Sequence, residues 1–181
     1  MIAAFGDSLT AGFGVDPDLS YPAFLQKELD RRGFNYNVVN LGISGDTSSG
    51  GVSRVNSVLE LKPEIVILEL GANDGLRGLP LASTRSNLSE MIETLRKGGA
   101  KVLLAGITLP PNYGPDYIRS FEKIYSDLAK QYAVPFLPFL LEGVATDRRL
   151  MQSDGLHPTA EGNRKVAMHV LESLESMLRK H

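Results

Sequence analysis

Short apolar runs alternate with longer stretches of helical periodicity, and this alternation constrains the fold more than any other feature of the sequence. The clearest run covers residues 65–70, is rich in β-branched side chains and has the length of a buried strand. Similar runs predict four further strands, at residues 2–5, 37–41, 101–106 and 134–137.

Apolar residues at helical spacing fill the segments between these strands. We expect helices from a cap at Ser20 to Gly33, after Thr47, before Gly98 and Gly99, around residues 117–128, and from about Thr159.

Strands that alternate with helices of this length predict a parallel sheet covered on both faces. Five strands favour an α/β fold of three layers, α/β/α, with the flavodoxin-like strand order 2-1-3-4-5. The 181 residues suit a single domain, residues 1–181, and no linker, repeat or low-complexity segment interrupts them.

Glycine-rich turns with polar side chains follow the first three strands, and a fourth such turn precedes the last helix. They cover residues 6–9, 42–46, 71–75 and 154–158. In the expected order, strands one and three are neighbours, and a ligand site is expected in the crevice at their carboxyl ends. We therefore expect all four turns to meet there.

Ser8 in the first turn is a candidate nucleophile, but a serine hydroxyl is weak until a base removes its proton. Of the three histidines, His169 falls within the last helix and His181 is the final residue, so only His157 lies in a turn. Asp154, three residues before it, is near enough to accept from the imidazole Nδ1 and leave Nε2 facing the serine. Because the base must be neutral, we expect activity to rise from weakly acidic pH to a neutral or alkaline plateau.

Attack on a carbonyl also needs donors for the developing oxyanion. The candidates are the Ser8 backbone N–H, Gly45, whose N–H is accessible without a Cβ, and the Asn73 side-chain amide.

Each turn also has a purely structural interpretation. Asp7 and Ser8 are typical of a helix cap, Gly45 and Gly71 of tight turns, Asp46 and Asp74 of braces for turns, and Asp154 with His157 of a cap beside a surface histidine. Because all four turns are expected to meet at one end of the sheet, the sequence favours a catalytic role for their polar residues.

Composition and missing motifs argue against other classes. A net charge of −2 without a basic block gives no basis for nucleic-acid binding, and the absence of cysteine excludes thiol chemistry. No apolar run approaches the roughly 18 residues of a membrane span, so we expect no stable membrane insertion. A non-catalytic flavodoxin-like module is one alternative, but no G-x-G-x-x-G or Walker pattern follows the first strand. A metal-dependent hydrolase is disfavoured because HExxH is missing, and an α/β-hydrolase because G-x-S-x-G is missing. We expect no metal and no cofactor.

Taken together, the four turns resemble the sequence blocks of the SGNH hydrolases, the GDSL lipase and esterase family. The matching segments run in the family's order across nearly the whole chain: Gly6-Asp7-Ser8-Leu9, the glycine of Ser44-Gly45-Asp46, Gly71-x-Asn73-Asp74, and Asp154-x-x-His157-Pro158. The resemblance implies a serine esterase that works through an acyl-enzyme. It implies Ser8, Asp154 and His157 as the triad, and the Ser8 N–H, Gly45 and Asn73 as the oxyanion hole.

Within the family, the chain looks most like the bacterial multifunctional acyl-CoA thioesterase, arylesterase and lysophospholipase group. This closer resemblance rests on SGDTSSGG from Ser44, ELGANDGLRG from Glu69, LPPNYG from Leu109 and VPFLPFLLEGV from Val134. Ala72 departs from the second glycine common in the group, which puts substrate breadth in doubt. The group is usually exported, which favours a periplasmic or secreted protein whose leader has been trimmed over a cytoplasmic one.

The expected partner is a small acyl ester or thioester, bound by a monomer. Apolar residues near Asn73 and the last turn are candidates for an acyl groove. They are Leu76, Leu79, Leu109, Pro110, Tyr113 and Leu156. The alternative is that Leu79 and Leu109 are buried caps of the core. We expect a medium-length acyl chain to be preferred over a sugar acetate.

Overall fold

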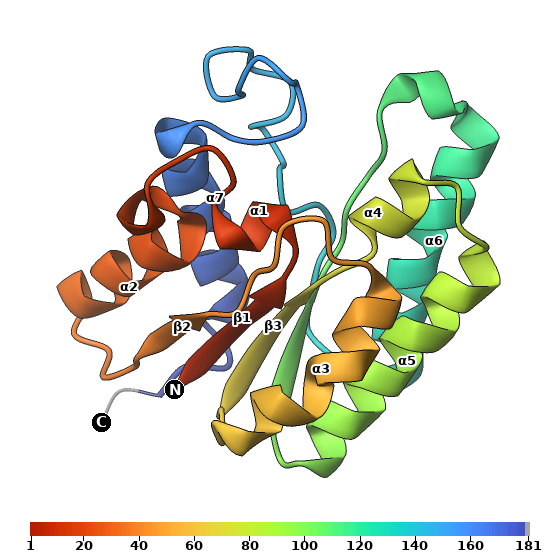
Figure 1. Ribbon diagram of the computed structural model, residues 1–181. Helices are drawn as coiled ribbons and strands as arrows, with labels where there is room; N and C mark the ends of the chain where they lie inside the picture. The colour runs from red at the N-terminus through yellow and green to blue at the C-terminus, as the bar shows by residue number, and fades with distance from the viewer. Residues whose placement is uncertain (180–181) are drawn as a thin grey trace.

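A five-stranded parallel sheet forms the centre of the computed structural model, which describes residues 1–179 (Figure 1). The strand order is β2-β1-β3-β4-β5, as the sequence predicts. The strands are β1 (Ile2–Gly6), β2 (Val38–Asn40), β3 (Ile65–Glu69), β4 (Lys101–Ala105) and β5 (Phe136–Leu137).

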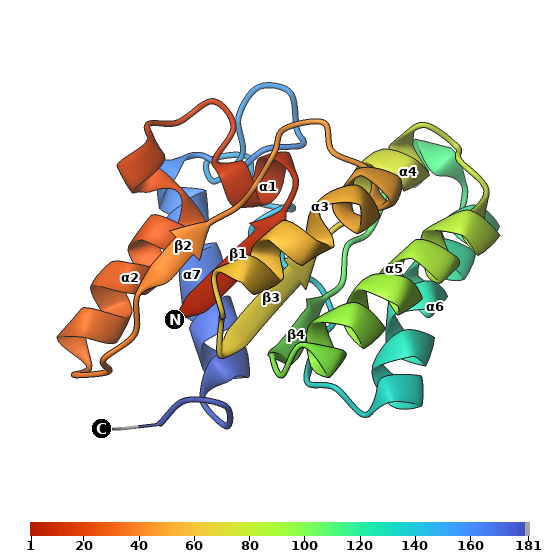
Figure 2. The same cartoon turned by 60° about the horizontal axis from the view of Figure 1, so that its bottom comes forward.

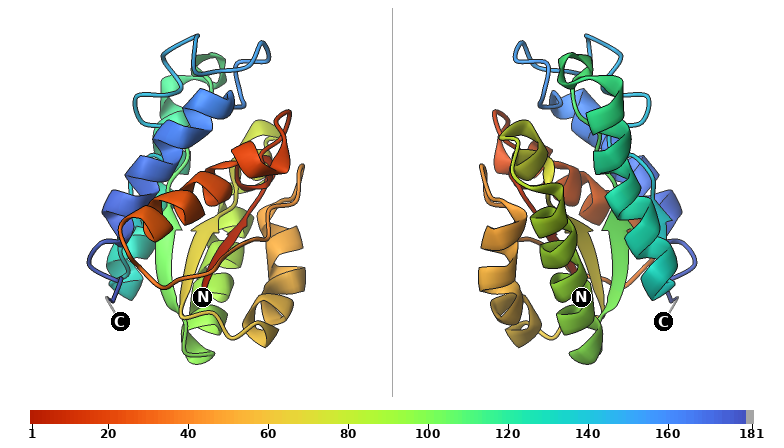
Figure 3. Two further views of the ribbon diagram at one scale, coloured as in Figure 1. Left: turned by 90° about the vertical axis from the view of Figure 1, so that its left-hand side faces the viewer. Right: turned by 90° about the vertical axis from the view of Figure 1, so that its right-hand side faces the viewer.

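Helices cover both faces of this sheet. They are α1 (Ser8–Ala11), α2 (Tyr21–Arg31), α3 (Ser48–Glu60), α4 (Ala72–Leu76), α5 (Leu81–Lys97), α6 (Pro115–Tyr132) and α7 (Ala160–Leu174), with 3₁₀ turns η1 (Pro17–Leu19) and η2 (Pro111–Tyr113). Figure 2 shows α3 and α5 along one face, and Figure 3 shows the sheet between these helices and the α2–α7 pair. Among residues 1–179, no helix is both long and apolar enough to cross a bilayer.

Alternating side chains of the strands supply two separate cores. In β1, Ile2 and Ala4 pack toward α2 and α7, whereas Ala3 and Phe5 pack toward α3, α5 and α6. All four are fully buried. Burial on both faces is the physical reason why these strands read as continuous apolar runs in the sequence.

Several helices begin at the residues that the sequence indicates. Thr47 caps α3 and Thr159 caps α7, each side-chain oxygen accepting from a backbone N–H three residues on. Ser20 holds the cap position of α2, but its hydroxyl donates to the Pro17 carbonyl instead of capping the helix.

The short helices α1 and α4 were expected only as glycine-rich turns, with Ser8 at the start of a turn or helix. Both follow directly on the carboxyl ends of neighbouring strands, β1 and β3. Gly71, at φ +114°, makes the sharp entry into α4 that a side chain would oppose. Polar residues on these helices are thereby brought to the same edge of the sheet.

Candidate active site

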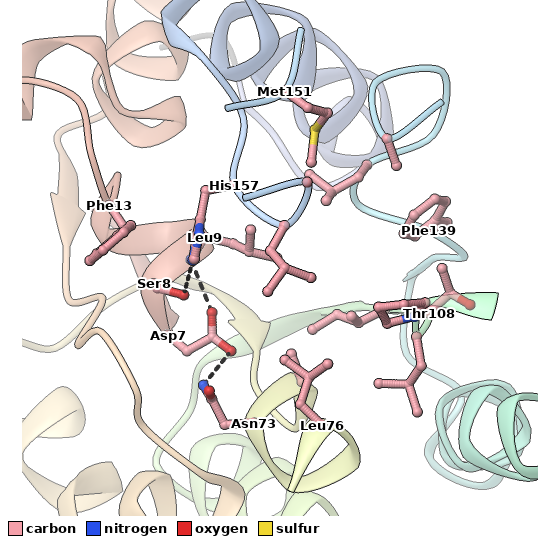
Figure 4. Close-up of a pocket in the computed structure, with 18 of the residues that line it drawn as sticks. Asp7, Ser8, Leu9, Phe13, Asn73, Leu76, Thr108, Phe139, Met151 and His157 are labelled. Carbon is pink, nitrogen blue, oxygen red and sulfur yellow. Dashed lines mark hydrogen bonds between the residues drawn. The ribbon is translucent and has the colours of Figure 1, made fainter. Parts of the chain in front are cut away.

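The four glycine-rich turns meet at the carboxyl edge of the sheet. Ser8 begins α1 after β1, Gly45 lies between β2 and α3, Asn73 lies on α4, and Asp154 and His157 lie in the turn before α7. Figure 4 shows Ser8 and His157 facing each other on one side of a cavity.

Asp154, His157 and Ser8 form a continuous chain of hydrogen bonds. The His157 Nδ1 atom lies 2.5 Å from Asp154 Oδ2, and the His157 Nε2 atom lies 2.9 Å from Ser8 Oγ. The other carboxylate oxygen, Asp154 Oδ1, accepts from the backbone N–H groups of Leu156 and His157, so it also fixes the turn. This geometry leaves Nε2 able to accept the serine proton.

The environment of Asp154 keeps it ionised. Burial acts to raise its pKa, but hydrogen bonds from the His157 side chain and from the Leu156 and His157 N–H groups outweigh burial, and the pKa lies below its usual range. A carboxylate at this position stabilises a charged imidazole.

Two backbone donors beside Ser8 are unpaired. Within residues 1–179, neither the Ser8 N–H nor the Gly45 N–H donates to a protein acceptor. The Asn73 Nδ2 atom donates to the Asp46 carbonyl at 2.8 Å and more weakly to Asp7 Oδ2 at 3.3 Å. The three predicted oxyanion donors thus border one space, which is lined by Ser8, Gly45 and Asn73.

Asp46 and Asp74 brace the turns, as their structural interpretation suggests. Asp46 forms an ion pair with Arg54 at 2.8 Å, and Asp74 accepts from both the backbone and the hydroxyl of Ser48. Asp74 therefore ties α4 to the start of α3 and holds Asn73 beside the Gly45 loop.

A cavity of about 730 Å³ opens from Ser8 and His157. This volume is typical of small-molecule sites, and the lining is mainly apolar. The predicted groove residues Leu76, Leu109, Pro110 and Leu156 line it. Leu109 is 4% exposed, so it is both a core residue and a wall of the cavity.

Leu79 and Tyr113, which were also expected in the groove, are not among the residues that line this cavity. The Leu79 side chain is 38% exposed. The Tyr113 hydroxyl donates to the Leu76 carbonyl, so this side chain supports the end of α4 from outside the cavity.

Other lining residues were not anticipated, among them Phe13, Ile118, Phe139 and Met151. The Phe13 ring packs on the His157 imidazole, with centroids 4.6 Å apart. Figure 4 shows Phe139 across the cavity from Ser8. Phe13, Phe139 and Met151 lie outside the named helices and strands, where no periodic pattern marks them. Ile118 lies on α6 three residues before Phe121 and packs against the same core cluster, so helical spacing could have indicated it.

Of the two other histidines, the structure describes only His169, which is not among the residues that line the cavity. His169 is on α7, and its buried Nδ1 has no hydrogen-bond partner in the described chain. His181 lies outside the described residues.

Comparison with known proteins shows the family of the chain. Residues 4–165 match the GDSL-like Lipase/Acylhydrolase family. The chain belongs to this family.

Relatives within the GDSL family cover almost the whole chain. Esterase TesA of Pseudomonas aeruginosa is 46% identical over 96% of this chain and 87% of its own length. Thioesterase 1/protease 1/lysophospholipase L1 of Escherichia coli is 38% identical over 96% of this chain and 82% of its own. A TesA crystal structure superposes with a TM-score of 0.95 at 45% identity, covering 98% and 99% of the two chains.

A second solved structure is that of an inhibited esterase. The esterase EstA from Pseudoalteromonas, described as inhibited by monoethylphosphonate, superposes with a TM-score of 0.92 at 31% identity over 97% of both chains. With these relatives, the present chain is a carboxylic ester hydrolase.

Proposed function

We propose that Ser8 is the nucleophile of this hydrolase, with His157 as its base and Asp154 as the residue that orients the base. The observation that carries the proposal is the 2.9 Å distance between His157 Nε2 and Ser8 Oγ, because it allows direct proton transfer. Neither alternative, a binding module or a metal-dependent hydrolase, explains this contact.

Each half of the reaction then follows from the same atoms. Ser8 Oγ bonds to the substrate carbonyl carbon as its proton passes to His157 Nε2. The imidazolium returns that proton to the leaving oxygen or sulfur when the carbon–heteroatom bond breaks, and the acyl-enzyme remains. Water then attacks the acyl carbon as His157 takes one of its protons. When the bond between the acyl carbon and Ser8 Oγ breaks, His157 returns that proton to Oγ, and the carboxylic acid is released.

The negative oxygen of each tetrahedral intermediate lies among the Ser8 N–H, the Gly45 N–H and the Asn73 amide. Among residues 1–179, two of these donors have no protein acceptor, so they are available when charge develops on that oxygen. Loss of one such donor typically lowers turnover by roughly 10²–10³-fold.

We propose that the apolar cavity takes the acyl chain of a medium-length ester or thioester. Its size and apolar lining exceed what an acetyl group requires. Relatives named arylesterase, in Vibrio mimicus, and thioesterase 1/lysophospholipase L1, in Escherichia coli, support activity on both linkages.

A serine-reactive phosphonate tests the central assignment. We expect one phosphonyl group per chain, located on Ser8 by peptide mass spectrometry, and loss of both label and esterase activity in Ser8→Ala. Ser53→Ala is the matched control, since this exposed serine on α3 donates only to the Ser49 carbonyl. Full esterase activity in Ser8→Ala would refute the proposal.

A further inference from the structure

A buried carboxyl pair lies directly beneath Ser8, and the reaction proposed above does not use it. The Asp7 and Glu69 side chains belong to residues that are 1% and 0% exposed. Glu69 Oε2 accepts from the Asp7 backbone N–H at 3.2 Å and from the Thr10 hydroxyl at 2.7 Å. A Cβ on Gly6 would lie 2.5 Å from this oxygen, so the glycine before Asp7 makes room for the buried acid.

The two oxygens of Asp7 face different parts of the site. Oδ1 accepts from the Leu9 N–H at 3.0 Å and thereby caps α1, the helix that begins with Ser8. Oδ2 accepts from the Asn73 amide at 3.3 Å, as drawn in Figure 4. Asp7 therefore connects the helix that carries the nucleophile to the side chain that would hold the oxyanion.

The surroundings of the pair favour a single negative charge. Within residues 1–179, no Lys or Arg side chain forms an ion pair with either carboxyl, and Glu69 Oε1 has no hydrogen-bond partner. Arg54 on α3 is occupied by Asp46 and by the Gly6 carbonyl. Two carboxyl groups so close together and excluded from water do not readily ionise together.

The other titratable groups that face the pair come from several elements. They are Asp46 before α3, His157 before α7, Tyr21 on α2 and Tyr125 on α6. Burial raises the pKa of Asp7 to about 6. Burial, followed by the charge of Asp7, raises the pKa of Glu69 well above its usual range. Both shifts disfavour two charges at once, and Asp7, whose oxygens accept from the Leu9 N–H and the Asn73 amide, is the carboxyl placed to hold the single charge.

We propose that Asp7 is a positioning residue for the oxyanion hole, holding the Asn73 amide and the start of α1 as a carboxylate above a neutral Glu69. This role rests on the proposed function of Ser8 and Asn73. A carboxylate accepts from both Leu9 and Asn73, whereas an amide offers one oxygen and turns an N–H group toward one of the two donors. The 3.3 Å contact is long for a hydrogen bond, so the Asn73 N–H is able to turn toward a substrate oxyanion.

A double-mutant cycle on an aryl ester tests this role. We expect Asp7→Asn to lower kcat by roughly 10–100-fold while KM changes by less than about threefold, since it disturbs an oxyanion donor and no ground-state contact. In an Asn73→Ala background, the same substitution should lower kcat by less than about threefold, because Asp7 then has no amide to hold and the oxygen of an asparagine can still accept from the Leu9 N–H. Equal costs in the two backgrounds would overturn the proposal.

Glu69→Gln is the matched control, because glutamine reproduces the shape and neutrality of a protonated Glu69. We expect kcat within about threefold of wild type for this variant, and a loss as large as that of Asp7→Asn would contradict the assignment of the charge. Thermal melts of all variants separate this result from unfolding.

The pH profile supplies a readout that a merely structural role would not change. Protonation of Asp7 removes the carboxylate that holds Asn73, so in wild type it should add about one to the slope of log kcat/KM at acidic pH. Asp7→Asn should reduce the slope by about one, and an unchanged slope counts against the proposal. Phosphonate labelling of Ser8 in wild type keeps this outcome separate from a failure of the proposed function.

Discussion

At the scale of single residues, the site depends on how three carboxyl groups are treated by their surroundings. Asp154 accepts three hydrogen bonds and has a lowered pKa. Asp7 and Glu69 are buried, form no ion pair with Lys or Arg among residues 1–179, and have raised pKa values. A carboxyl group is therefore kept ionised beside the base at Asp154, and its ionisation is disfavoured at Glu69. This division follows from local contacts and not from residue type.

The ionisation of Asp154 leads to a prediction about pH. Asp154→Asn should lower kcat/KM by roughly 10²–10⁴-fold at neutral pH, since it removes the charge that stabilises the imidazolium. Because the pKa of Asp154 is lowered, wild-type activity should rise from about pH 5 to a plateau without any contribution from this carboxyl.

Asp147→Asn is a suitable control for that measurement. Asp147 lies in the same loop, and hydrogen bonds from Arg149 lower its pKa to about 2, but it does not line the cavity. A flat wild-type rate between about pH 5 and about pH 8, or an Asp147 variant as impaired as Asp154→Asn, would contradict the assignment.

At the scale of elements, the segments that follow the strands build the cavity. α4, the connection between β4 and α6, and the segment between β5 and α7 contribute Leu76, Pro110, Phe139 and Met151 to its walls. None of these segments is part of the sheet. The sheet therefore brings these segments to one edge, and the segments themselves carry both the candidate reacting groups and the cavity walls.

This arrangement predicts how chain-length preference responds to mutation. In a series of p-nitrophenyl esters, kcat/KM should be highest for medium acyl chains. Phe139→Ala should move the optimum to longer chains, because Phe139 lies across the cavity from Ser8. Leu79→Ala, which changes a residue outside the lining, should leave the optimum in place. Turnover of acetate alone would refute the acyl-chain proposal.

The sequence predicts the strands well and the cavity poorly, for physical reasons. Buried strands are marked by continuous apolar runs, and the strand order follows from the alternation with helices. α1 and α4 are too short to show helical periodicity and contain glycine or polar residues. Phe13 and Phe139 line the same cavity from distant parts of the chain, and no local pattern in the sequence connects them.

The buried pair of Asp7 and Glu69 also leaves no local pattern in the sequence. Asp7 and Glu69 are 62 residues apart in sequence and meet only because β1 and β3 are paired, with Gly6 opposite Glu69. By contrast, Asp154 and His157 are three residues apart, so their contact was predictable from spacing.

At the scale of the whole molecule, the buried carboxyl pair affects stability. The pKa of Asp7 is raised from 3.8 to about 6 by folding, so the folded state holds a proton that the unfolded state releases. The resulting stabilisation is complete below about pH 4 and is lost as the pH rises through about 6, a change of about 3 kcal/mol.

We therefore expect the unfolding free energy of Asp7→Asn to improve relative to wild type between about pH 4 and about pH 7, by up to about 3 kcal/mol. Denaturant titrations of both proteins at each pH measure the difference, and the pH-independent loss of hydrogen bonds cancels between the two pH values. A constant difference across this range would show that Asp7 has an ordinary pKa in the folded protein.

The turn before α7 has a consequence for how such an enzyme can change over time. Asp154 and His157 are three residues apart and are locked together by the side chain and by two backbone N–H groups. Insertions or deletions elsewhere between β5 and α7 would move Asp154 and His157 together. The loop can therefore diversify around the substrate wherever the pair still returns to within hydrogen-bond reach of Ser8 Oγ.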